Sequence, residues 1–174
     1  MRTSLLHLSV APALVLLLSA CGSKSHEGSK AEKLSPSQLP AAVTQTVNSR
    51  LPGAQVNKAE RENEEGAVIY DLELTQNGRK FEMDVKEDGT LVEIEKQVDA
   101  ATLPGSSRNQ IKSKYTGATI KDVMEVNKVV GGKETPDHYE VTLETADHKS
   151  VEFNVSLDGK VGSGEEEKGE GENK

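Results

Sequence analysis

The sequence predicts an α+β fold built from two tandem repeats, each a helix followed by an antiparallel sheet. The first observation is an internal repeat, in which Leu39-Pro40 recurs 64 positions later as Leu103-Pro104 and further motifs follow in the same order. The second is a change of period, because apolar residues recur every four positions after each Leu-Pro and then every two. The third is Asn77-Gly78, a strong hairpin signal between two alternating runs.

The chain begins with a predicted signal peptide, residues 1–20. Arg2 precedes an apolar run from Leu5 to Leu18, which is the order of charge and hydrophobic residues in secretory signals, and the run is too short for a confident membrane span. Its end, Leu18-Ser19-Ala20-Cys21, resembles the lipobox of bacterial lipoproteins, in which small residues precede a cysteine that becomes acylated. The resemblance implies cleavage before Cys21. An ordinary secretory signal and a short membrane anchor with an incidental cysteine are the alternatives.

Lipidation agrees with the cysteine content of the chain. Cys21 is the only cysteine, so it has no partner for an intramolecular disulfide, and a bare thiol would risk cross-linking after export. The lipoprotein resemblance implies a diacylglycerol and a further acyl chain such as palmitate, and two or more chains anchor a protein stably in a membrane. Gly22 is not acidic, which favours the outer membrane. We expect a lipid-anchored protein of the bacterial cell envelope that faces the periplasm or the exterior.

Two polar segments flank the predicted repeats. Residues 21–36 are small, polar and charged without apolar periodicity, which indicates a flexible tether. Residues 162–174 contain Glu165-Glu166-Glu167 and then alternating glycine and glutamate. Such a segment cannot bury enough apolar area to offset its chain entropy, so we expect a disordered acidic tail.

Repeat 1 is expected over residues 37–97 and repeat 2 over residues 101–161. Each opens with a predicted helix whose apolar face has a spacing of four. A proline suits the first turn of each helix, and Pro52-Gly53 and Gly117 end the two helices. The apolar faces consist of Leu39, Val43, Val47 and Leu51 in repeat 1, and of Leu103, Ser107, Ile111 and Tyr115 in repeat 2.

Alternating strands follow each predicted helix. In Val68 to Thr75 and Phe81 to Lys86, every second residue is apolar, which places one face in the core and one mostly polar face outside. Residues 54–62 and 118–130 supply a first strand for each repeat, and a short strand follows Asp88-Gly89. The outer face is expected to be solvated, with partner binding as the alternative, and it carries Glu73, Glu82, Asp84, Glu140 and Glu152.

The charge of the chain limits its partners. The formal net charge is −8 at pH 7, and cleavage before Cys21 removes Arg2 but no acidic residue. Nucleic acid and bare anionic lipid are disfavoured, because either requires a concentrated basic patch. The chain has no Trp, and its Tyr and Phe residues fall at predicted core positions. Polar recognition is therefore favoured over a tight interface anchored by aromatic side chains.

The order of these elements resembles the PepSY-like domain, in the form grouped with the β-lactamase-inhibitor protein. The likeness rests on Leu39-Pro40, Leu51 to Ala54, Tyr70 to Leu74, Asp84 to Gly89 and their counterparts, and it spans roughly residues 37–161. It implies two α+β units whose sheets join or abut, each covered by a helix, in a secreted or envelope protein without catalytic residues. Members of this family are suspected of restraining hydrolases or of binding envelope partners.

Candidate catalytic and metal-binding groups are few, and we expect neither an enzyme nor a cofactor. Cys21 is committed to lipid, and no serine lies in a nucleophile elbow. His138 and His148 bracket a strand of ~10 residues, which would separate them by about 30 Å and prevents them from sharing a metal. Asp84 to Glu95 has carboxylates at the first and twelfth positions of a calcium loop, but Lys86 stands where a ligand oxygen is required, so a plain turn is favoured.

These observations favour a non-catalytic binding module over an enzyme. We expect it to meet another envelope protein through the polar sheet face or through the hairpin tips at Asn77-Gly78 and Asp147-His148. No metal site and no small-molecule substrate are evident in the sequence. Two roles stay open: restraint of a hydrolase or protease, which the family resemblance implies, and a structural or assembly scaffold of the outer membrane.

Overall fold

The computed structural model describes residues 31–64 and 66–166, which form one nine-stranded antiparallel sheet and two α-helices. The predicted α+β class is confirmed. The strands lie in the sheet in the order in which they occur in the chain. They are β1 (Glu32–Leu34), β2 (Gln55–Glu64), β3 (Ala67–Gln76), β4 (Arg79–Lys86), β5 (Leu91–Gln97), β6 (Thr119–Val130), β7 (Lys133–Glu144), β8 (Ser150–Ser156) and β9 (Glu165–Glu166). The helices are α1 (Ala41–Arg50) and α2 (Gly105–Lys114), and the 3₁₀ turns η1 (Pro36–Gln38) and η2 (Ala100–Thr102) precede them.

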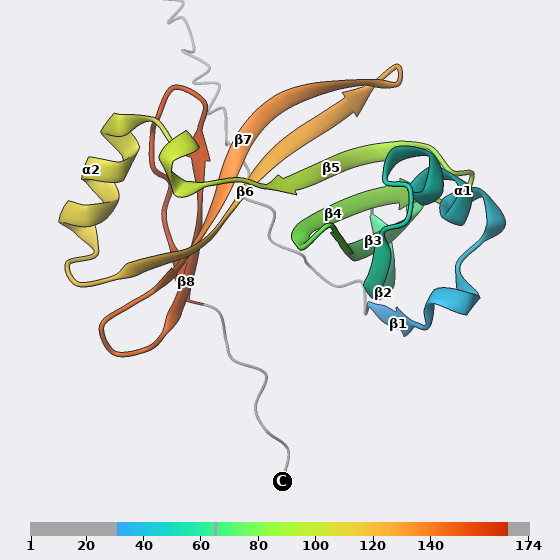
Figure 1. Cartoon of the computed structure of the whole chain (residues 1–174), viewed down its shortest axis with the longest axis horizontal. Helices are drawn as coiled ribbons and strands as arrows, with labels where there is room; N and C mark the ends of the chain where they lie inside the picture. The colour runs from blue at the N-terminus through green and yellow to red at the C-terminus, as the bar shows by residue number, and fades with distance from the viewer. Residues whose placement is uncertain (1–30, 65, 167–174) are drawn as a thin grey trace, which may run out of the picture.

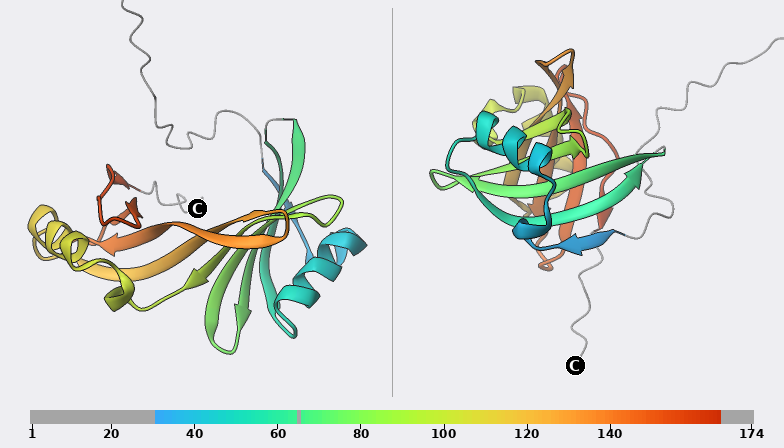
Figure 2. Two further views of the ribbon diagram at one scale, coloured as in Figure 1. Left: turned by 90° about the horizontal axis from the view of Figure 1, so that it is seen from above. Right: turned by 90° about the vertical axis from the view of Figure 1, so that its right-hand side faces the viewer.

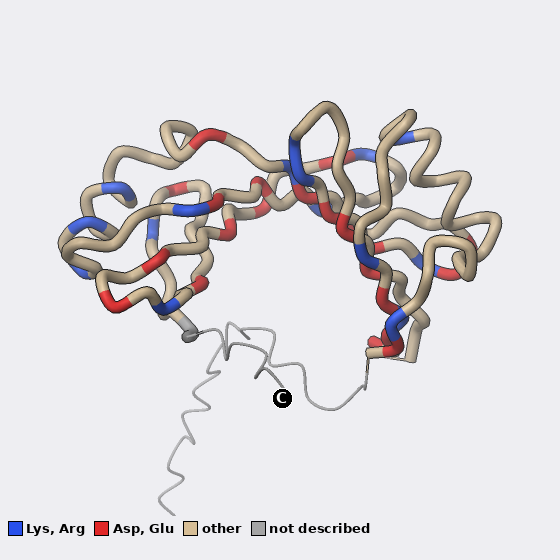
Figure 3. Tube along the Cα trace, turned by 60° about the horizontal axis from the view of Figure 1, so that its bottom comes forward, with Lys and Arg blue, Asp and Glu red and all other residues tan. Residues whose placement is uncertain are grey.

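The sheet bends into an arch, and both helices lie on its outer, convex side (Figures 1 and 2). Helix α1 covers the half made of β2 to β5, and α2 covers the half made of β6 to β8. The inner, concave side of the arch carries neither helix (Figure 3). The two hydrophobic cores therefore lie on the convex side, and the concave side is mainly polar but includes the buried Ile69, Met124 and Val126.

The first hydrophobic core lies between α1 and the convex face of β2 to β5. Val43 and Val47 are the buried residues of α1, and Leu51 follows at its end with only 6% of its surface exposed. Their spacing of four places all three on one side of the helix, as the sequence predicts. They pack with alternate residues of the strands, which include Tyr70, Leu72, Leu74, Met83, Val85 and Ile94.

The second hydrophobic core is likewise built from one helix and the strands that it covers. Ser107 and Ile111 are the buried residues of α2, and Leu103 lies just before the helix with 2% of its surface exposed. Ser107 is fully buried, and its hydroxyl donates to the Pro104 carbonyl oxygen over 2.7 Å, so no polar group is left without a partner there. The strands contribute Val123, Val141, Leu143, Val151, Phe153 and Val155.

An Asp-Gly turn packs against each helix at an equivalent place. The Thr46 hydroxyl of α1 donates to the Gly89 carbonyl oxygen over 2.6 Å, and the Gln110 amide of α2 donates to the Gly159 carbonyl oxygen over 3.3 Å. Both glycines have positive φ, 86° and 87°. A Cβ on Gly89 would lie 2.9 Å from the backbone oxygen of Ala42. Glycine is therefore required there by the approach of the helix as well as by the backbone conformation.

The two halves share one sheet, because β5 pairs with β6 over five residue pairs, from Glu93↔Lys128 to Gln97↔Met124. The resemblance left open whether the sheets join or abut, and they join. The β6–β7 hairpin also reaches back to the first half. Arg50 of α1 donates to the Gly132 carbonyl oxygen over 3.4 Å and to Glu134 over 3.2 Å, and Lys96 also pairs with Glu134.

Two short strands lie where the sequence analysis expected none. Strand β1 falls within the predicted tether and pairs with β2, and β9 falls within the predicted tail and pairs with β8. Backbone hydrogen bonding to an open sheet edge orders polar residues that have no apolar pattern of their own.

Residues 1–20 of the predicted signal peptide lie outside the described residues. Among the residues described, neither helix has the length and apolar character needed to cross a membrane.

Candidate binding surface

The concave side of the arch carries a row of carboxylates. Successive residues of a strand point to opposite faces, so the residues that alternate with the core residues of β2 to β5 and of β7 point to this side. Figure 3 shows acidic positions along the inside of the arch. They line a depression of about 140 Å³ together with Ile69, and we call it the acidic trough. Its acidic residues are Glu62, Glu64, Asp71, Glu82, Asp84, Glu93, Glu95 and Glu140.

Glu82 and Glu95 lie directly opposite one another in the β4–β5 register. Burial raises the pKa of Glu95 to about 9, and the charges of Glu140 and Glu82 add to this effect. Burial also raises the pKa of Glu82 to about 7, and repulsion from Asp71 adds to it. A carboxyl with a pKa above the ambient pH keeps its proton. Near neutral pH, Glu95 is thus protonated, and Glu82 is close to its titration midpoint.

One oxygen of Glu95 is buried without a hydrogen-bond partner. Among the described residues, Glu95 Oε2 is the buried side-chain oxygen or nitrogen with no partner in the protein. Leaving such a group unsatisfied costs roughly 1–3 kcal/mol, because the group has lost its contact with water. The trough therefore holds a buried carboxyl oxygen that a hydrogen-bonding group from outside the described residues would satisfy.

The cations of the concave face form ion pairs with carboxylates other than those of Glu82, Glu95 and Asp71. Lys128 pairs with Glu93, and Lys58 Nζ lies 3.1 Å from Glu73 Oε1. His138 lies 3.4 Å from Glu140, and hydrogen bonding to Glu140 raises the pKa of His138 against the opposing effect of burial. The ion pairs found among the described residues do not include Glu82, Glu95 or Asp71. Negative charge in the trough is consequently only partly compensated.

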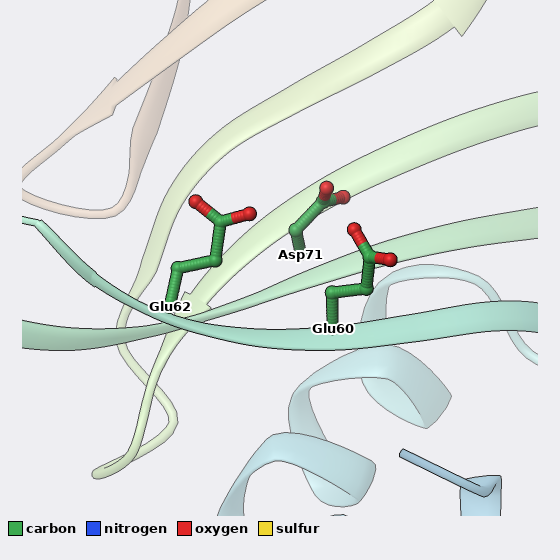
Figure 4. A group of neighbouring side chains, drawn as sticks. All are labelled: Glu60, Glu62 and Asp71. Atoms are coloured by element: carbon green, nitrogen blue, oxygen red, sulfur yellow. The ribbon is translucent and has the colours of Figure 1, made fainter. Parts of the chain in front are cut away.

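Three carboxylates at one side of the trough converge as metal ligands do. Glu60 and Glu62 of β2 and Asp71 of β3 each offer an oxygen, and these oxygens lie within 4.8 Å of one another (Figure 4). Burial raises the pKa of Asp71 to about 6, in the presence of Glu60 and Glu62. Oxygen ligands of this kind suit a hard cation such as Ca²⁺. However, Glu60 already pairs with Lys58 over 3.3 Å, which makes it a less available ligand.

The hairpin tips predicted to contact a partner form turns in separate hairpins. Asn77 and Gly78 join β3 to β4 with positive φ values of 53° and 79°, so the predicted hairpin is confirmed. Asp147 and His148 lie in the longer connection from β7 to β8, where His148 has a φ of 60° and its Nδ1 lies 3.2 Å from Glu144 Oε1. The contact of these hairpin tips with a partner stays a prediction. The predicted lipidation site, Cys21, lies outside the described residues.

The segment considered as a calcium loop is a hairpin turn. Strand β4 ends at Lys86, β5 begins at Leu91, and the Gly89 amide donates to the Lys86 carbonyl oxygen over 2.8 Å. The favoured interpretation as a plain turn is confirmed. The two histidines bind different neighbours, since His138 contacts Asp137 and Glu140 whereas His148 contacts Glu144.

The acidic trough is not predicted by the sequence pattern. The pattern predicts a solvated face for Glu82, Asp84 and Glu140, but they are half-buried on the concave side of a bent sheet. Alternating carboxylates in neighbouring strands were the available signal. Three consecutive strands carry acidic residues at every second position, which places like charges opposite one another once the strands pair.

Comparison with known proteins agrees with this architecture. A family model described as "Putative beta-lactamase-inhibitor-like, PepSY-like" matches residues 24–93 and again residues 69–162. Together the two matches span well over half of the chain. The chain belongs to this PepSY-like family. The matches overlap over residues 69–93, which contain the β3–β4 hairpin and the start of β5.

Solved structures give the same fold at low sequence identity. A DUF2874 family protein from Bacteroides uniformis is similar with a TM-score of 0.53 and 15% identity, over 73% of this PepSY-like chain and 88% of that one. A protein from Bacteroides eggerthii, described as among "putative periplasmic proteins", is similar with a TM-score of 0.54 and 13% identity over the same shares. The comparison with curated proteins gave no match.

Proposed function

We propose that this PepSY-like chain is a lipid-anchored, non-catalytic binding protein of the bacterial envelope, and that its concave face contacts a partner protein. The observation that carries the proposal is the separation of faces. Both helices and both hydrophobic cores occupy the convex side, whereas the concave side presents half-buried acidic groups of β2 to β5 and of β7 to the outside, with the buried Met124 and Val126 of β6 between β5 and β7. Half-buried polar side chains on such a face favour a partner that offers hydrogen bonds and charges to them.

Several features support placement in the envelope. The lipobox-like run before Cys21 predicts export and acylation. The similar structure from Bacteroides eggerthii is described as periplasmic. Export to an oxidising compartment also agrees with a chain that has a single cysteine. We propose that lipid on Cys21 holds the chain at a membrane, with the outer membrane preferred, and that the residues after it connect the anchor to β1.

The proposed action is restraint of an envelope hydrolase or protease. The family description names likeness to a β-lactamase inhibitor, and an arch whose concave face carries neither of the two described helices has the shape to receive a convex element of an enzyme. A scaffold role for outer-membrane assembly is the rival. Both roles use the same face, so the identity of the partner distinguishes them.

In-cell photocrosslinking tests this proposal. A photoreactive amino acid is placed at Asn77 or Asp147 in the hairpin tips, or at Asn154, which is exposed in β8 opposite Glu140 of the concave face. Captured proteins are identified by mass spectrometry. Lys112, exposed on α2 at the convex side, is the matched control position. Capture of a hydrolase from the first three positions but not from Lys112 supports restraint, and capture of assembly proteins supports a scaffold. Equal capture from Lys112, or no captured protein at any position, contradicts the binding role of the concave face.

A further inference from the structure

The acidic trough differs in its chemistry from the rest of the concave face. It gathers carboxylates from five strands around Ile69, and its two opposed residues Glu82 and Glu95 have no ion pair among the described residues. Glu95 Oε2 is buried and lacks a hydrogen-bond partner among the described residues. A ligand that fits here must bring positive charge and several N–H donors.

The size of the trough decides between ligand classes. Its volume is about 140 Å³, well below the ~300–1,000 Å³ of pockets that enclose small molecules. A space of this size accepts the end of one long side chain. A guanidinium group has five N–H donors in a planar fork, and it binds carboxylates in a bidentate manner. Arginine is therefore the side chain whose donors best match two opposed carboxyls.

A metal ion fits the centre of the trough less well. Among the described residues, the group whose oxygens converge within 4.8 Å is Glu60, Glu62 and Asp71, on β2 and β3. Neither Glu82 nor Glu95 belongs to that group. An elongated donor that spans the carboxyls of neighbouring strands agrees with this spacing, whereas a single ion needs the ligand oxygens around one point.

We infer that the trough receives a protruding basic segment of the partner protein, with an arginine side chain inserted between Glu82 and Glu95. The concave arch fits a convex segment such as a hairpin or loop, and the acidic lining, in which Glu82 and Glu95 have no ion pair among the described residues, supplies the charge complementarity. The insertion gives Glu95 Oε2 a hydrogen-bond partner, and the positive charge of the guanidinium favours ionisation of Glu82 and Glu95. This inference rests on the proposed function and names the chemistry of the partner.

Fluorescence anisotropy with a defined peptide tests the inference. The probe is a labelled, disulfide-closed β-hairpin peptide with two arginines at its turn, and its neutral counterpart carries citrulline at those places. The full chain is purified from membranes in detergent. We expect binding of the arginine peptide, at least roughly tenfold weaker binding of the citrulline peptide, and a similar loss for the Glu82→Gln/Glu95→Gln variant.

A second double variant controls for the loss of two carboxyl groups. Glu87 and Asp88 lie exposed in the β4–β5 turn, which packs beside α1 on the convex side, so Glu87→Gln/Asp88→Asn replaces two carboxyls by amides away from the trough. We expect its affinity to stay within about twofold of the unaltered chain. Because glutamine is isosteric with glutamate, both variants should fold, and thermal unfolding verifies this. Asp71→Asn, at the side of the trough, should give an intermediate loss.

Three results would overturn the inference. The first is equal affinity for the arginine and citrulline peptides. The second is an affinity loss in the turn variant that equals the loss in Glu82→Gln/Glu95→Gln. The third is binding of calcium chloride alone with no binding of either peptide, which would assign the trough to a metal ion. The proposed function and the arginine insertion can fail separately. If the Glu82→Gln/Glu95→Gln variant still captures a partner in the cell, the proposed function stands and the arginine insertion is wrong.

Discussion

Glu82 on β4 and Glu95 on β5 are direct cross-strand partners on the concave face, where two acidic side chains lie opposite one another. Ionisation of both would place like charges at these positions, which destabilises a sheet. Burial raises the pKa of Glu95 to about 9 and that of Glu82 to about 7. The pair therefore works against folding at neutral pH in the absence of a partner, as binding sites often do.

Replacing Glu95 by glutamine should stabilise the protein at neutral pH. The folded pKa of Glu95, about 9, lies above the ordinary value of 4.5, so the folded state binds the proton more tightly than the unfolded state. The resulting stability is fully present below the ordinary pKa and is lost as pH rises toward about 9. At about pH 7 the variant should gain on the order of 1–3 kcal/mol, and near pH 4 the gain should vanish.

Urea unfolding at both pH values measures this difference. Glu87→Gln, at an exposed position of the β4–β5 turn, is the control and should change the free energy of unfolding by less than about 0.5 kcal/mol. A variant that is less stable than the unaltered chain at neutral pH would contradict the burial of an unpaired carboxyl at Glu95.

Binding of the arginine hairpin should weaken as the pH falls. Protonation removes the negative charge that attracts the peptide, and burial raises the pKa of Asp71 to about 6 and that of Glu82 to about 7. The affinity should therefore be highest near about pH 8 and fall steadily toward about pH 5. Anisotropy titrations across this range provide the measurement. The Glu82→Gln/Glu95→Gln variant should give a flatter profile, and an unchanged profile would show that other groups control binding.

Gly89→Ala should be more destabilising than Gly66→Ala. Both glycines have positive φ, 86° and 83°, so alanine is strained at each by about 1 kcal/mol. At Gly66 the new Cβ meets no atom within 4 Å, whereas at Gly89 it lies 2.9 Å from the Ala42 backbone oxygen. The turn must therefore move away from α1 and weaken the Thr46 hydrogen bond. Thermal and urea unfolding of both variants tests the ranking, and equal losses would place the turn farther from the helix.

Leu72→Ala and Leu143→Ala should each cost about 3 kcal/mol of stability. Leu72 is fully buried in the first core and Leu143 is 1% exposed in the second. Each change removes a large apolar group and leaves a cavity in a packed interior. Chemical denaturation measures the loss, and Leu157→Ala, at a side chain that is 46% exposed, is the control. A loss below about 1 kcal/mol at either core position would mean that its half is loosely packed.

Cys21→Ser should abolish membrane anchoring. The lipobox-like run Leu18 to Cys21 predicts acylation of the cysteine sulfur, and serine cannot form the same thioether. Mass spectrometry of the mature N-terminus should find a diacylglycerol and a further acyl chain on Cys21 in the unaltered chain. Membrane fractionation should move the variant to the soluble fraction or leave its signal peptide attached. An unmodified cysteine or cleavage at another residue would refute the lipoprotein prediction.

Local pattern was sufficient to predict the helices, the hairpins and the family. Val43 and Val47 follow the helical period, Tyr70 and Leu72 follow the strand period, and Asn77-Gly78 fixes a short turn. Each of these depends on neighbours in the chain, and so does the likeness to the PepSY-like domain that the family match confirms. The strands β1 and β9 escaped prediction because pairing with an existing sheet edge, and not their own composition, orders them.

The tertiary structure alone decided where the charged groups meet. The sequence placed Glu82 and Glu140 on an outer face, but it contained no information on how far the sheet would bend or that β5 would pair with β6. Those two facts bring carboxylates of strands far apart in the chain into one trough. Burial and repulsion then raise their pKa values, because both effects depend on distances and solvent access that only the packed sheet sets.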